Sequence, residues 1–154
     1  MWTENHSEYF YLNINTPGKN MFEYCFNVRG YELDSNGHAN HANYLNYFEQ
    51  ARWELVREAG LMNFFKENGL SIIVIEITAR YSREVKLFDE LVVRTEVLKE
   101  SPYLLFKQKM YFKDSNIKAC QASVKVVFME EGRLVRDIPE EIIHKLSYNG
   151  VRKL

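Results

Sequence analysis

The sequence YELDSNGHANHANY, from Tyr31 to Tyr44, decides the fold and joins a segment typical of a β-strand to one typical of an α-helix. It gathers carboxylate, histidine and asparagine side chains around Gly37. Such groups are costly to bury unless they form hydrogen bonds, and glycine allows backbone conformations that other residues rarely adopt. The helix that follows offers unpaired backbone N–H groups and a partial positive charge at its start. The segment is therefore a candidate active-site turn.

The residues alone leave two interpretations of this turn open. A carboxylate facing a helix start can attack a carbonyl group, or direct water at it, while the helix N–H groups hold the carbonyl oxygen. Aspartate, asparagine and glycine before a helix are also ordinary turn and capping residues. The spacing by itself favours the capping interpretation.

A longer motif changes this balance. Asp34, Gly37, His41 and Tyr44 are followed by LNYFEQAR, which ends at Arg52. Together they resemble the signature of the hot-dog-fold acyl-CoA thioesterases of the 4-hydroxybenzoyl-CoA thioesterase type. The resemblance implies an α+β fold in which an antiparallel sheet wraps around one long central helix. It also implies a homodimer or homotetramer with active sites at the subunit interface.

The stretch NGHAN, at positions 36–40, is similar to a second group of the same fold, the acyl-carrier-protein thioesterases. Two carriers for the acyl group therefore stay open, coenzyme A and a carrier protein. Two further functions also stay open: a hot-dog dehydratase or hydratase of acyl thioesters, and a non-catalytic module that binds acyl thioesters.

The remaining pattern agrees with this fold. Side chains alternate over residues 22–28, an apolar stripe at helical spacing runs over residues 43–59, and strand-like segments follow at 70–81, 91–98, 103–112 and 117–129. Ile73, Ile75, Ile77 and Ala79 are expected on one face of their strand. We expect one domain over residues 1–154, with a lead-in at 1–20 and a short helix at 139–147. Strands without intervening helices favour an antiparallel α+β arrangement.

Composition excludes several classes of protein. A net charge of −1 provides no overall attraction to nucleic acid or membrane, and no apolar run is long enough to span a bilayer. The start of the sequence is unlike a signal peptide, and Cys25 and Cys120 lie far apart, so we expect reduced thiols in the cytoplasm. No Gly-rich phosphate loop, Gly-x-Ser-x-Gly or His-Glu-x-x-His motif is present. We expect no metal or cofactor.

The resemblance implies roles for the catalytic residues. Asp34, in a turn shaped by Gly37, is the expected nucleophile or general base. The backbone N–H near His41 is the expected oxyanion donor, and the His41 side chain could orient Asp34 or assist the leaving thiolate. Glu49 is the alternative carboxylate, because a second hot-dog group places its carboxylate on the central helix. An ion pair between Glu49 and Arg52 is the simpler interpretation.

Further residues are candidates for substrate binding. His38, Asn40 and Asn43 either polarise the thioester carbonyl or satisfy the turn, and Tyr44 is expected to form a wall of the acyl pocket. The phosphates of coenzyme A require a basic rim, for which the candidates are Arg80, Arg83 and Lys86. The identity of the acyl group does not follow from the sequence.

Overall fold

The computed structural model describes residues 21–148. The elements in order are β1 (Phe22–Asn27), the 3-10 helix η1 (Gly30–Glu32), α1 (His41–Glu58), α2 (Leu61–Glu67), β2 (Leu70–Tyr81), β3 (Glu90–Glu100), β4 (Tyr103–Phe112), β5 (Lys118–Glu130), β6 (Arg133–Leu134) and α3 (Glu140–Tyr148). The expected lead-in at 1–20 lies outside the described residues, so the division of the chain into lead-in and single domain stays a prediction.

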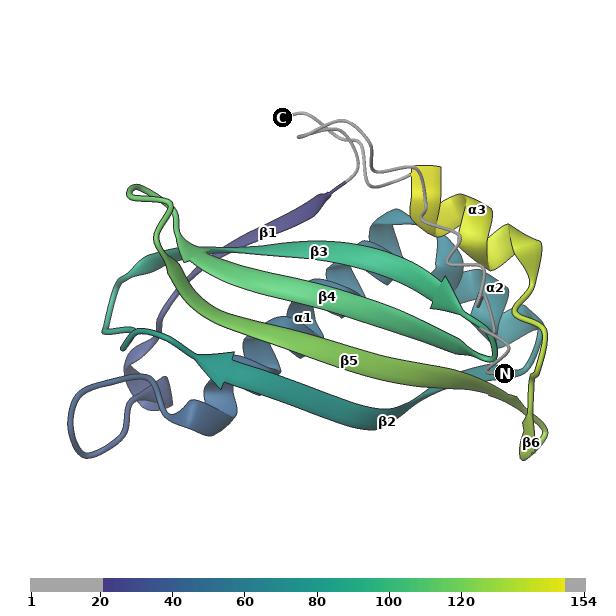
Figure 1. Cartoon of the computed structure of the whole chain (residues 1–154), viewed down its shortest axis with the longest axis horizontal. Helices are drawn as coiled ribbons and strands as arrows, with labels where there is room; N and C mark the ends of the chain where they lie inside the picture. Colours follow the sequence, from purple (N-terminus) through teal and green to yellow (C-terminus); the bar gives the residue numbers. More distant parts are fainter. Residues whose placement is uncertain (1–20, 149–154) are drawn as a thin grey trace, which may run out of the picture.

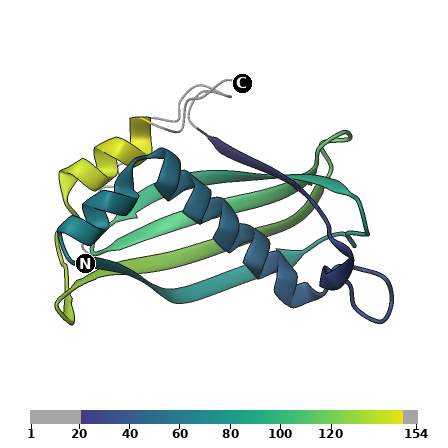
Figure 2. The same ribbon diagram turned by 180° about the vertical axis from the view of Figure 1, so that it is seen from behind.

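One antiparallel sheet and one long helix form the body of the protein. The strand order is β1-β3-β4-β5-β2, and β6 pairs with β5. Figure 1 views the sheet from the side away from α1, and Figure 2, from behind, shows α1 lying across the opposite face. The predicted α+β hot-dog arrangement, with the sheet wrapped around the central helix, is confirmed.

Burial of the apolar stripe holds α1 against the sheet. Tyr44, Tyr47, Phe48, Ala51 and Leu55 are all buried, as their three- and four-residue spacing predicts. Alternate residues of β4 face this helix, while the residues between them face outward. Fully burying one such large apolar side chain contributes about 1.5–3 kcal/mol, so the stripe fixes which face of the sheet the helix covers.

The start of α1 differs slightly from the prediction. The helix begins at His41, two residues before the expected Asn43. The cause is a cap, because the side-chain Oδ1 of Asn40 accepts a 3.0 Å hydrogen bond from the backbone N–H of Ala42. The helix start therefore lies directly against the turn at Asp34.

β2 has its predicted bounds, but the prediction that its isoleucines and Ala79 share one face was wrong. Ile75 has no partner residue, because Val74 pairs with Val126 and Glu76 pairs with Lys125. This bulge interrupts the alternation of side chains. Ile73 therefore lies on the other face from Ile77 and Ala79, which pair with Val124 and Ala122. Ile73, Ile75 and Ile77 are 45%, 49% and 41% exposed. β2 is an edge strand with an exposed apolar surface.

Helices α2 and α3 lie at the end of the sheet opposite the 33–40 turn (Figure 1). Ile142 and Leu146 bury the inner side of α3 in the core, and Ile138, just before the helix, is buried as well. No helix in residues 21–148 combines the length and the hydropathy needed to cross a membrane.

Candidate active site

The turn before α1 is a small hairpin closed by backbone hydrogen bonds. The Asp34 N–H donates to the His38 carbonyl at 2.7 Å, and the Gly37 N–H donates to the Asp34 carbonyl at 3.1 Å. Leu33 and Ala39 form an isolated bridge below the turn. Gly37 has a φ of 78°, in the left-handed region that favours glycine. Backbone hydrogen bonds thus close the loop, so its side chains are not needed for that closure.

The carboxylate of Asp34 uses one oxygen for the turn. Its Oδ1 accepts hydrogen bonds from the backbone N–H groups of Asn36, at 2.8 Å, and His38, at 3.2 Å. Its second oxygen, Oδ2, has no hydrogen-bond partner within residues 21–148. The half-buried side chain therefore fits both interpretations of the sequence, as a turn residue and as a carboxylate with one oxygen available for chemistry.

The first turn of α1 leaves one N–H group available. The Ala42 N–H donates to the side chain of Asn40, and the Asn43 N–H donates to the Asn40 carbonyl at 2.8 Å. The backbone N–H of His41 has no acceptor among the described residues. This group lies at the positive end of the helix dipole, which makes it a candidate oxyanion donor.

The two histidines of the motif lie in different surroundings. The His38 Nε2 lies 3.2 Å from the Glu84 Oε2. The His41 side chain is exposed, and it forms neither a hydrogen bond nor an ion pair with the carboxylate of Asp34 in the part of the chain that the structure describes. Within this single chain, the imidazole of His41 does not orient Asp34. In the same range, no cluster of histidine, cysteine and carboxylate side chains could hold a metal ion.

A buried carboxylate that the sequence analysis missed holds the helix start in place. Glu32 is 6% exposed and accepts hydrogen bonds from the Arg29 N–H, at 2.9 Å, and the Tyr47 hydroxyl, at 2.7 Å. Its carbonyl accepts from the Asn40 N–H and from the Asn43 Nδ2, both at 2.8 Å. Burial raises the pKa of Tyr47, and the hydrogen bond to Glu32 adds to the effect. Asn43 therefore anchors the helix to the turn.

The only sequence signal for Glu32 is its position. It follows Arg29 by three residues, between the apolar residues Val28 and Leu33. That spacing suits the reciprocal capping of η1, in which the Glu32 side chain accepts from the Arg29 backbone. The burial of Glu32 depends on its contact with Tyr47 of α1, fifteen residues further along the chain. Local spacing therefore does not predict it.

Two tyrosines connect α1 with the end of β2. Tyr44 is 4% exposed, and its hydroxyl donates to the Arg83 carbonyl at 3.2 Å. The Tyr81 hydroxyl donates to the His41 carbonyl at 3.0 Å, and its ring meets that of Tyr44 edge-on, with centroids 5.1 Å apart. Burial raises the pKa of Tyr44 to about 12. Tyr44 is therefore neutral at neutral pH, and its role as a wall of the acyl pocket stays a prediction. Tyr81 is a neighbour that the sequence analysis missed.

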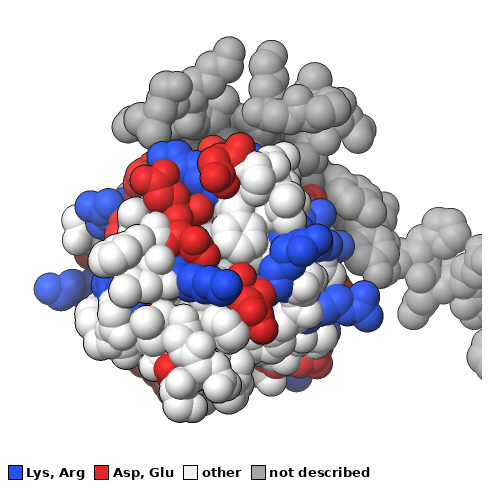
Figure 3. All heavy atoms as spheres, turned by 90° about the vertical axis from the view of Figure 1, so that its left-hand side faces the viewer, with Lys and Arg blue, Asp and Glu red and all other residues white. Residues whose placement is uncertain are grey.

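The loop after β2 brings two of the expected basic residues beside the turn. The Ala39 N–H donates to the Val85 carbonyl at 2.7 Å, and His38 forms a bridge with Lys86. Arg83 and Lys86 are exposed on this loop. Arg80 does not join them, because it lies on the face of β2 turned away from α1. Figure 3, which views this end of the molecule, shows basic and acidic side chains interspersed.

The alternative carboxylate lies away from the turn. Glu49 is exposed on α1, eight residues after His41, which corresponds to about 12 Å along the helix. The expected ion pair with Arg52 is not found among residues 21–148, where Arg52 Nη1 donates to Gln108 Oε1 at 2.9 Å. Gln108 is buried and donates in turn to the Phe48 carbonyl at 2.9 Å. Within one chain Glu49 therefore lies about two turns along α1 from the helix start that follows Asp34.

Fold and turn together define a thioesterase-like protein of the hot-dog fold. Residues 28–146 match the Thioesterase-like superfamily, and the chain belongs to this family. It is 31% identical to the acyl-CoA thioesterase YbgC of Haemophilus influenzae over 116 residues, which cover 72% of this chain and 84% of YbgC.

Solved structures agree with this assignment. A protein of Aquifex aeolicus superposes with a TM-score of 0.74 at 28% identity, over 81% of this chain and 98% of that one. A 1,4-dihydroxy-2-naphthoyl-CoA thioesterase of Synechocystis also superposes with a TM-score of 0.74, over 82% of this chain and 95% of that one. Its identity of 14% supports the fold alone.

Proposed function

We propose that this protein hydrolyses acyl-CoA thioesters to the free acid and coenzyme A, with Asp34 as the acting carboxylate. The observation that carries the proposal is the free Oδ2 of Asp34 in a turn that leads directly to the unpaired N–H of His41. Membership of the thioesterase-like family and the similarity to an acyl-CoA thioesterase support coenzyme A as the carrier.

In the proposed reaction the thioester carbonyl oxygen accepts a hydrogen bond from the His41 N–H. Asp34 Oδ2 either removes a proton from water, which adds to the carbonyl carbon, or adds to that carbon itself to form an anhydride that water then cleaves. In both routes the C–S bond breaks, and the thiolate takes up a proton. One oxyanion donor contributes about 3–4 kcal/mol to transition-state stabilisation in other enzymes.

The substrate would approach the exposed side of the turn, where the loop after β2 lies hydrogen-bonded beside it. Tyr44 supports this side as a buried wall, and Arg83 and Lys86 are exposed close to the turn, where they could meet the phosphates of coenzyme A. Asn40 and Asn43 act in this proposal by holding the helix start, since their side chains already form hydrogen bonds to the backbone. His38 stays a candidate for carbonyl contact.

We also infer that the protein assembles at least as a homodimer through the edge of β2. An exposed apolar edge strand invites pairing with a second chain, and β2 exposes Ile73, Val74, Ile75 and Ile77. Pairing of this kind would place the turn at Asp34 near a subunit interface. Cys25 and Cys120 are free thiols, which suits the cytoplasm that we infer as the location.

Thioester turnover by the purified full chain tests the proposal. Release of free thiol is followed with a panel of aliphatic and aromatic acyl-CoA substrates, and with the matching acyl-carrier-protein thioesters. We expect hydrolysis of acyl-CoA, and its loss in the Asp34→Asn variant. Binding of acyl-CoA without turnover across the panel would contradict the proposal, as would loss of water from a 3-hydroxyacyl thioester as the only reaction.

A further inference from the structure

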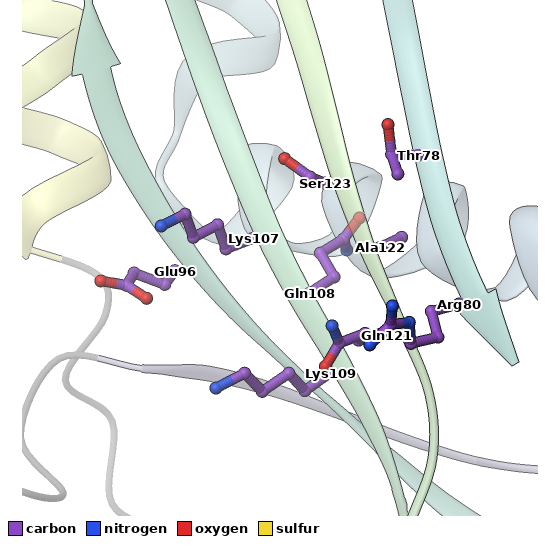
Figure 4. A pocket seen from close by; sticks show the side chains of 9 residues that line it. All are labelled: Thr78, Arg80, Glu96, Lys107, Gln108, Lys109, Gln121, Ala122 and Ser123. Carbon is purple, nitrogen blue, oxygen red and sulfur yellow. The ribbon is translucent and has the colours of Figure 1, made fainter. Parts of the chain in front are cut away.

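The face of the sheet turned away from α1 carries a groove with a volume of about 630 Å³. The cross-strand register assembles it from four strands. Lys109 of β4 lies opposite Gln121 of β5, which lies opposite Arg80 of β2. One row along the sheet, Glu96 lies opposite Lys107, which lies opposite Ser123. Figure 4 shows these side chains around the groove.

The groove lies on the other side of the sheet from α1. In β4, Phe106, Gln108 and Met110 are buried beneath the helix, so Lys107 and Lys109 between them face outward. The turn at Asp34 leads into α1 on the concave side of the same sheet (Figure 2). Any ligand of the groove would therefore be separated from the proposed thioester site by the thickness of the sheet.

Three cations of the groove form no direct pair within the described residues. Arg80, Lys107 and Lys109 have neither an ion pair nor a side-chain hydrogen bond with any described residue. On the same face, by contrast, Arg94 donates to Glu23 at 2.7 Å. Like charges on neighbouring positions of a sheet repel one another. An anion bound between these three side chains would remove that repulsion.

One carboxylate, that of Glu96, lines the groove beside the three cations, which leaves an excess of two positive charges. Ser123 and Thr78 add hydroxyl groups opposite each other on β5 and β2, and Gln121 adds an amide. The charged and polar ends of these side chains therefore carry an excess of positive charge. They suit oxygen-rich anions, which lysine and arginine bind through charge-assisted hydrogen bonds.

The spacing of the cations indicates a ligand with several phosphates. The Cα atoms of Arg80 and Lys109 are two strand spacings apart, about 10 Å, and those of Lys107 and Lys109 are about 7 Å apart along one strand. Side chains of this length reach a single phosphate together only by bringing the three cations close to one another. A row of two or three phosphates laid across β5 can contact each of the three cations without moving them together. The volume of the groove suits a small molecule.

We propose that this groove binds a linear polyphosphate group, either free or carried by a nucleoside triphosphate, at a site separate from the thioesterase centre. Arg80 and Lys109 hold the two ends of the phosphate chain, Lys107 adds its charge beside the Lys109 end, and Gln121 and Ser123 donate to its oxygens. Glu96 opposes binding and limits its strength.

Isothermal titration calorimetry of the full chain with inorganic tripolyphosphate and with ATP, in low salt, tests this proposal. We expect saturable binding of at least one probe, weakened about tenfold or more by Arg80→Gln and by the double variant Lys107→Gln/Lys109→Gln. Glu96→Gln should strengthen binding about threefold, because it removes the opposing charge. Lys66→Gln, on the exposed side of α2, is the matched control and should leave Kd unchanged.

Binding of both probes shows that the phosphate chain is sufficient, and binding of ATP alone shows that the nucleoside is also required. The absence of binding at millimolar concentrations would overturn the proposal, as would equal weakening by Lys66→Gln or a weaker Kd in Glu96→Gln. Altered assembly of the double variant in sedimentation would also overturn it, because the face would then be a subunit interface. Acyl-CoA hydrolysis by the double variant at the wild-type kcat separates this site from the proposed thioesterase function.

Discussion

The Tyr47 hydroxyl donates a 2.7 Å hydrogen bond to the buried carboxylate of Glu32 and so ties the second turn of α1 to the segment before the Asp34 turn. Because Glu32 is only 6% exposed, loss of this donor leaves its Oε2 in the interior with the Arg29 N–H as the remaining hydrogen-bond donor. We expect Tyr47→Phe to lower the free energy of unfolding by about 1–3 kcal/mol, as measured by urea denaturation.

The matched control is Tyr31→Phe, which removes a hydroxyl from a ring that is 79% exposed. Its effect should stay within about 0.5 kcal/mol. Equal stability of the two variants would show that the bond between Tyr47 and Glu32 does not contribute to the fold.

Two substitutions at Asp34 separate its structural role from its proposed chemical role. Asn keeps an oxygen that can accept from the Asn36 and His38 N–H groups, whereas Ala removes it. We expect kcat/KM to fall about 10²–10⁴-fold in both variants, the range for loss of an acid–base group. Only Asp34→Ala should also lose stability, by about 1 kcal/mol. Near wild-type turnover in Asp34→Asn would remove the carboxylate from the reaction.

The proposed role of the His41 backbone predicts a mild effect of changing its side chain. The imidazole is exposed, while the N–H that we assign to the oxyanion belongs to the main chain. We therefore expect His41→Ala to change kcat less than about tenfold, well below the roughly 10²–10³-fold cost of losing an oxyanion donor. A loss of that larger size, measured under single-turnover conditions, would assign the chemistry to the imidazole instead.

The exposed surface of β2 predicts where a second chain pairs. The double variant Ile73→Lys/Ile75→Lys places charges on an edge strand, a change that discourages edge-to-edge pairing. We expect it to shift the molar mass from light scattering from an oligomer to a monomer. Met62→Lys, which alters a residue that is 47% exposed on α2, is the control and should keep the wild-type mass. A monomeric wild-type chain would contradict the inferred dimer.

The buried phenol of Tyr44 predicts a loss of stability in alkali. Its pKa is raised by burial from 10.0 to about 12, so the unfolded chain releases this proton at lower pH than the folded chain. The stabilisation is complete below pH 10 and is lost as the pH rises towards 12, by about 2–3 kcal/mol in total. Urea denaturation between pH 9 and pH 11 should show a steeper decline for the wild type than for Tyr44→Phe. An equal decline of the free energy of unfolding with pH in the two proteins would contradict this prediction.

Local spacing was enough for most of the elements. The alternation in residues 103–112 predicts β4 with its observed bounds, and the stripe from Tyr44 to Leu55 predicts the face that α1 buries. Both patterns repeat within a few residues, so they can be recognised without knowledge of distant contacts. The motif also located the turn at Asp34, because the Gly37 conformation and the Asn40 cap are local features.

The sequence by itself determined the class of fold, the position of the central helix and the turn that carries Asp34, because periodicity and capping are properties of neighbouring residues. Tertiary structure alone decided the bulge at Ile75, the burial of Glu32 beneath Tyr47 and the gathering of Arg80 with Lys107 and Lys109. The physical reason is the same for all three. Each depends on the register or packing between elements far apart in the chain, and no local pattern specifies which residues will lie opposite one another.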